Sequence, residues 1–99
     1  MEDCRKLGRV LFTGHALRRM FERSLTHKEV EEVLRCGDIV VTYPDDKPFS
    51  SFLMLGFVDQ RPIHVVAAID SQSQTAYIVT AYDPDPDLWE PDFRTRRSP

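Results

Sequence analysis

The sequence predicts an α+β domain in which two N-terminal helices pack on a four-stranded antiparallel sheet. Apolar residues recur with a helical period before Gly37, and runs of β-branched and aromatic residues follow it. Only short links separate these later runs, and short links favour antiparallel neighbours. The 99 residues are expected to form one domain (1–99), with a core over 10–83 and an extended tail over 84–99. The apolar stretch 10–12 is a candidate for a short extra strand before the helices.

The first helix is expected to begin at Thr13 or Gly14. At about 100° per residue, Leu17, Met20 and Phe21 gather on one face of it. We expect this face to pack in the core.

The second helix is expected to begin after Thr26, which forms a capping box with Glu29 three residues later. Val30 and Val33 begin its apolar stripe. Gly37 is expected to close the helix in the left-handed conformation.

Four strands should follow, over residues 39–43, 52–58, 63–69 and 75–82. The third is apolar on both faces, so it is expected to lie in the middle of the sheet. Gly56 indicates a bulge or a close approach of another element. Beyond the last strand, Trp89 and Phe93 are expected to pin the tail to the body.

Charge and composition exclude some classes of function. The net charge is −3, whereas bulk nucleic-acid binders carry a strong positive excess, so only a local basic cleft would fit such a role. The longest apolar run, 65–69, is too short to cross a bilayer, and no membrane association is expected. Nothing in the sequence indicates secretion, so we expect Cys4 and Cys36 to be reduced thiols in a cytoplasmic protein.

His15, Arg19 and Arg23 stand four residues apart and form one polar stripe along the first helix. One imidazole and two guanidiniums could grip phosphate oxygens, because a planar guanidinium binds them in a bidentate way. The alternative is a solvated helix face with no specific role.

His64 lies within an apolar strand, where a polar ring needs a partner or a cleft. It could act as a general acid or base near neutral pH, or it could be a hydrogen-bonded core histidine. Thr80 and Tyr82 share one face of the last strand, and Tyr82 could orient a phosphate or a base, or simply pack on the sheet.

No metal or cofactor is expected, since the Cys and His residues lack paired ligand spacing and no glycine-rich phosphate loop or nucleophile elbow occurs. Catalysis would then be metal-free acid–base chemistry with charge stabilisation. RNA suits such chemistry, because its own 2′-hydroxyl is the nucleophile.

Three separated motifs resemble the domain-of-unknown-function family 4258, which is similar to the BrnT and RelE/ParE toxins. They are FTGHALRRMFER at 12–23, the strand pair RPIHVV at 61–66 with IVTAYDPD at 78–85, and LWEPDFRTR at 88–96. The resemblance covers about residues 12–97.

The resemblance implies a RelE-like core of two helices and four strands, sometimes with a strand before the helices. It implies pairing with a small antitoxin, often one with a zinc ribbon and a helix-turn-helix domain. RelE-like members cleave mRNA on the ribosome without a metal, and ParE-like members inhibit gyrase. The positions it implies as functional are His15, Arg19, Arg23, His64, Thr80, Tyr82 and Arg96.

Three hypotheses follow. In the first, the chain is a metal-independent endoribonuclease toxin in which His64, with His15 as a second candidate, acts as acid or base. Tyr82 would orient the substrate, and the arginines, with Thr80 nearby, would bind phosphate. The second hypothesis is a non-enzymatic toxin that binds a protein such as gyrase. The third is a non-toxic interaction module.

Overall fold

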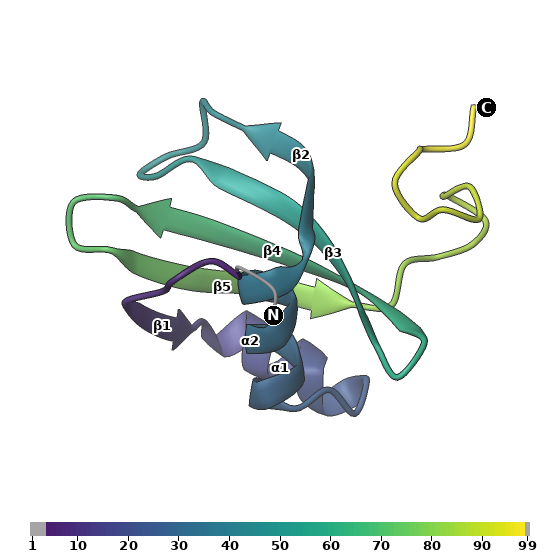
Figure 1. Ribbon diagram of the computed structural model, residues 1–99, viewed down its shortest axis with the longest axis horizontal. Helices are drawn as coiled ribbons and strands as arrows, with labels where there is room; N and C mark the ends of the chain where they lie inside the picture. The colour runs from purple at the N-terminus through teal and green to yellow at the C-terminus, as the bar shows by residue number, and fades with distance from the viewer. Residues whose placement is uncertain (1–3, 99) are drawn as a thin grey trace.

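Five strands and two helices make up residues 4–98, the part of the chain described by the computed structural model (Figure 1). In chain order they are β1 (Arg9–Phe12), α1 (Gly14–Glu22), α2 (His27–Cys36), β2 (Asp38–Tyr43), β3 (Ser51–Val58), β4 (Arg61–Asp70) and β5 (Thr75–Tyr82). The strands form a sheet in the order β1-β5-β4-β3-β2. The helices lie together on one side of it, with α1 against β5 and α2 against β3 and β4.

The prediction of a four-stranded antiparallel sheet is wrong, because a fifth strand joins its edge in parallel. β1 pairs with β5 from Arg9↔Thr75 to Phe12↔Ile78, so the sheet is mixed. This pairing satisfies the backbone groups along the outer edge of β5 and packs Phe12 against the core. The candidate strand at 10–12 does form, as β1, but its parallel pairing with β5, near the other end of the chain, leaves no trace in a local sequence pattern.

The buried face of α1 differs from the expected one. Thr13 caps the helix by accepting a hydrogen bond from the amide of Ala16 at 3.0 Å. Ala16 and Met20 are buried, but Leu17 is 43% exposed and Phe21 is 86% exposed, so the expectation that both pack in the core is wrong. The small side chain of Ala16 lets α1 lie close to β5, which turns the bulkier pair towards solvent.

α2 begins as predicted. The Thr26 side chain accepts from the Glu29 amide at 3.1 Å and the Glu29 carboxylate accepts from the Thr26 amide at 2.9 Å, which confirms the capping box. Val30 and Val33 are buried against the sheet. Within residues 4–98, neither helix has the length and apolar character needed to cross a membrane.

Gly37 and Gly56 lie where neighbouring atoms leave no room for a side chain. Gly37 has φ −76° and ψ 176°, so the expected left-handed closure of α2 is wrong. A Cβ on Gly37 would lie 2.6 Å from the Leu55 carbonyl oxygen. A Cβ on Gly56 would lie 2.8 Å from a Val33 methyl group, which confirms a close approach there: α2 rests directly on β3.

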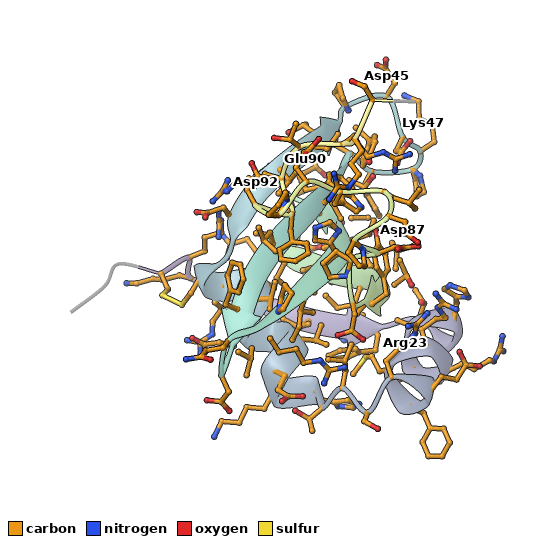
Figure 2. The ribbon with its side chains drawn as sticks, turned by 90° about the vertical axis from the view of Figure 1, so that its right-hand side faces the viewer. Arg23, Asp45, Lys47, Asp87, Glu90 and Asp92 are labelled. Atoms are coloured by element: carbon orange, nitrogen blue, oxygen red, sulfur yellow. A yellow bond between two sulfur atoms is a disulfide. The ribbon has the colours of Figure 1, made fainter. Side chains whose placement is uncertain are left out.

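The tail from residue 84 onward covers part of the other face of the sheet. Figure 2 shows its segment with Asp87, Glu90 and Asp92 passing across the strands. Trp89 is 5% exposed, and an ion pair joins Arg94 of the tail to Asp38 at the start of β2. The helices and the tail therefore cover opposite faces of the sheet.

The expectation of two reduced thiols is also wrong. Cys4 and Cys36 form a disulfide across a sequence separation of 32 residues, with their Cα atoms 4.7 Å apart (Figure 2). Arg5 explains the proximity: its amide donates to the Arg35 carbonyl at 2.8 Å, and its guanidinium donates to the Gly37 carbonyl at 2.7 Å. These contacts hold the N-terminal segment at the end of α2, and composition alone carries no information about them.

Candidate functional site

A cleft of about 230 Å³ opens where the C-terminal end of α1 meets the end of β5 and the tail. Two stretches that are distant in sequence, 19–23 and 82–96, supply its lining. It combines arginine, acidic, aromatic and aliphatic side chains: Arg19, Arg23, Tyr82, Asp83, Asp85, Leu88, Trp89 and Arg96. We call this site the arginine cleft.

The positive charge of the arginine cleft comes from two elements. Arg19 lies in the last turn of α1 and Arg23 at its C-cap, one turn further on, below the strands in Figure 2. Arg96 comes from the tail, with its guanidinium carbon 5.3 Å from the centre of the Trp89 ring. The tail therefore brings a third guanidinium, braced on an indole face, to the two arginines of α1.

Tyr82 lies under the influence of these charges. Burial, and after it Tyr43, raises the pKa of the Tyr82 phenol, and the positive charges of Arg96 and Arg19 act in the opposite direction. A tyrosine phenol is neutral at pH 7 and the raised pKa does not change this, so Tyr82 can donate a proton or a hydrogen bond to an anion in the cleft.

A bidentate ion pair braces the floor of the cleft. The Arg61 guanidinium donates to the two Asp83 carboxylate oxygens at 2.7 and 3.1 Å and to the Arg23 carbonyl at 2.7 Å. The hydrogen bond from Arg61 lowers the pKa of Asp83, whose charge is thereby compensated. Three arginines thus face Asp85 as the remaining acidic residue of the lining.

His64 lies beneath the tail and does not line the cleft. It is fully buried, its Nε2 donates to the Phe93 carbonyl oxygen at 2.9 Å, and the Trp89 and Tyr82 rings meet it edge-on at 4.7 and 5.5 Å. Burial lowers the pKa of the imidazole, and the hydrogen bond to Phe93 partly opposes this. In this arrangement His64 anchors the tail and has no contact with solvent.

Of the other predicted site residues, some line the cleft and some do not. Arg19, Arg23, Tyr82 and Arg96 come together in the cleft, although their sequence motifs lie far apart. His15 is exposed one turn before Arg19 and does not line the cleft, and half-buried Thr80 precedes Tyr82 on the same face of β5. Among residues 4–98, no group of three or more His, Cys, Asp or Glu side chains is arranged to hold a metal ion.

Sequence reasoning missed the residues that brace the cleft. Arg61 and Asp83 could have been found, because an antiparallel hairpin places the start of β4 beside the end of β5. Trp89 was expected only to pin the tail. Its second role, as a platform for Arg96, depends on the path of the tail, for which the sequence carries no periodic signal.

Comparison with known proteins yields one match. The family described as Domain of unknown function (DUF4258) matches residues 12–83. No curated protein and no solved structure matches the chain. The family match includes both helices, β2 to β5 and Tyr82, and it ends before the tail that supplies Trp89 and Arg96. The chain belongs to the DUF4258 family.

Proposed function

We propose that the chain is a metal-independent endoribonuclease acting on mRNA, the toxin of a toxin–antitoxin pair whose partner is a small zinc-ribbon and helix-turn-helix antitoxin. The observation that carries the proposal is the convergence of Arg19, Arg23 and Arg96 on Tyr82. Planar guanidiniums bind phosphate oxygens in a bidentate way, so a single phosphodiester suits the cleft. The motif resemblance to RelE/ParE and BrnT toxins supports the same reading.

The proposed reaction uses the nucleophile of RNA itself. The 2′-oxygen attacks the neighbouring phosphorus, the bond from phosphorus to the 5′-oxygen breaks, and a 2′,3′-cyclic phosphate and a 5′-hydroxyl result. His15, one turn before Arg19 and outside the lining, takes the proton from the 2′-hydroxyl through a water molecule, neutral Tyr82 gives one to the 5′-oxygen, and solvent restores both groups. Arg19 and Arg96 stabilise the charge that develops on the phosphorane. The burial of His64 favours a positioning role for it in place of acid–base catalysis.

Binding can be tested through its salt dependence. For single-stranded RNA, each phosphate contact contributes about 0.7 to the slope of log K against log salt. Because Arg19 and Arg96 bind the same phosphodiester in this proposal, the double variant Arg19→Ala/Arg96→Ala should lower that slope by about 0.7. Arg18→Ala removes an exposed charge of α1 that does not line the cleft, and it should leave the slope unchanged. Equal slopes for the wild type and the double variant would refute RNA binding in the cleft.

Cleavage can be tested with a matched pair of substrates. An RNA oligonucleotide should be cut to products with 2′,3′-cyclic phosphate ends in the presence of a metal chelator, and the same oligonucleotide with 2′-deoxy sugars should bind but remain intact. Arg19→Ala should slow cleavage by about 100-fold. Binding without cleavage would leave an RNA-binding protein and refute the nuclease.

A second candidate function, a toxin that binds a protein target such as gyrase, is favoured by the exposed apolar side of α1. Phe21 and Leu17 are exposed there, on the opposite side of Ala16 from the arginines. If Phe21→Ser abolishes growth arrest while RNA stays intact in arrested wild-type cells, the protein-binding function replaces the nuclease. A folded chain that causes no arrest would leave the non-toxic interaction module.

A further inference from the structure

A second cavity, of about 360 Å³, shares no lining residue with the arginine cleft. Six apolar residues and two cationic residues line it: Leu7, Leu34, Ile39, Phe52, Met54 and Ile69, with Arg5 and Lys6. We call it the N-terminal pocket. Its volume lies within the range of small-molecule sites, roughly 300–1,000 Å³.

The pocket exists because the two helices leave part of the sheet uncovered. α1 packs on β5 and α2 on β3 and β4, and the N-terminal segment 4–8 crosses the remaining area. The Cys4–Cys36 disulfide ties this segment at one end, and the Arg9 amide, which donates to the Gln74 carbonyl at 3.1 Å, ties it at the other. The described part of the chain therefore leaves apolar surface open beside the segment.

The polar groups of the pocket lie on this same segment. Arg5 is held in place by donating from Nη1 to the Gly37 and Arg35 carbonyls at 2.7 and 3.2 Å, and within residues 4–98 its Nη2 and Nε make no hydrogen bond. Lys6 is exposed beside it. Within residues 4–98, no carboxylate oxygen pairs with either cation at 4.0 Å or less. The pocket thus combines an apolar interior with a cationic edge.

The chemistry of the lining decides what could occupy the pocket. A peptide would need partners for its own amide and carbonyl groups; six of the eight lining side chains are apolar, β3 is paired on both sides, and only the outer edge of β2 could supply backbone partners. An alkyl chain has no such requirement. We propose that the N-terminal pocket binds a medium-chain fatty acid, with its tail against Ile39 and Met54 and its carboxylate at Lys6.

The test uses the full oxidised chain and three soluble probes: hexanoate, octanoate and decanoate. Because burial contributes about 0.8 kcal/mol per methylene, affinity measured by calorimetry should rise about 15-fold for each two methylenes added. Octanol has the same tail without the charge, so it should bind several-fold more weakly than octanoate. In methyl NMR, the probes should shift the Met54 signal and leave Met20, which does not line the pocket, in place.

Two exposed substitutions locate the site with little risk to folding. Lys6→Ala should weaken octanoate and leave octanol unchanged, and Ile39→Asp should weaken both, because it puts a carboxylate at the tail site. Lys28→Ala, an exposed cation of α2 outside the pocket, is the matched control and should change nothing. No binding, affinity that does not depend on chain length, or equal affinity in Ile39→Asp would overturn the proposal. None of these readouts depends on RNA or on growth arrest.

Discussion

The substitution His64→Phe tests whether burial of an imidazole under the tail makes folding sensitive to pH. His64 is fully buried, its Nε2 donates to the Phe93 carbonyl, and its Nδ1 has no hydrogen-bond partner within residues 4–98. Burial lowers the pKa of this imidazole in the folded state. The unfolded chain therefore takes up a proton near pH 6.5 that the folded chain resists.

Proton linkage gives the direction and the size of the effect of pH on the free energy of unfolding. Because the folded pKa lies below the unfolded one, the contribution of His64 to stability is complete above pH 6.5 and is lost as pH falls towards the folded pKa. The slope reaches at most about 1.4 kcal/mol per pH unit, so between pH 7.5 and 5.5 the free energy of unfolding should fall by up to about 1.3 kcal/mol. Carboxylates whose pKa is lowered, such as Asp83, act at lower pH, because their unfolded value is near 3.9.

The assay is urea unfolding at several pH values between 5.5 and 7.5. Trp89, the one tryptophan in the sequence, lies against His64 and supplies the fluorescence signal. At pH 7.5, His64→Phe should be less stable by about 1 kcal/mol, since the Phe93 carbonyl loses its donor. Its stability should then vary little as pH falls, whereas the wild type and the control His15→Gln should both lose stability. Parallel losses in the wild type and His64→Phe would refute the reasoning.

Two further predictions concern the fold. Reduction of the Cys4–Cys36 disulfide should lower the free energy of unfolding by about 3–4 kcal/mol, as expected for a closed loop of this length. Urea unfolding with and without a dithiol measures this difference. An unchanged urea midpoint would show that the disulfide does not form in solution. Gly56→Ala should cost about 1–3 kcal/mol, because its methyl group would press on α2, while the matched control Gly14→Ala meets nothing within 4 Å and should be tolerated. Equal thermal stability of the two glycine variants would contradict the close approach of α2 to β3.

Short sequence patterns predicted the structure correctly where it depends on neighbouring residues of one segment. The capping box of Thr26 and Glu29 depends on a spacing of three residues, and α2 begins where that spacing predicts. Gly56 was expected to mark either a bulge or a close approach, since glycine within a strand usually has such a cause, and the structure shows the close approach.

The predictions from sequence were wrong where the structure depends on contact with a segment that is distant in the chain. Leu17 and Phe21 fit a helical apolar face, yet contact with β5 turned Ala16 and Met20 inward. That rotation matters for the site, because it brings Arg19 to the end of β5, where the tail can add its own arginine.

The sequence by itself determined the N-terminal caps of both helices and the strand-forming segments, and its motifs named Arg19, Arg23, Tyr82 and Arg96 as candidate site residues. Only the tertiary structure decided that β1 joins β5 in parallel, that Cys4 meets Cys36, and that His64 lies under the tail while Tyr82 borders an open cleft. The physical reason is range: capping and strand propensity act over a few residues, whereas burial and charge at a site depend on surfaces that distant segments bring together.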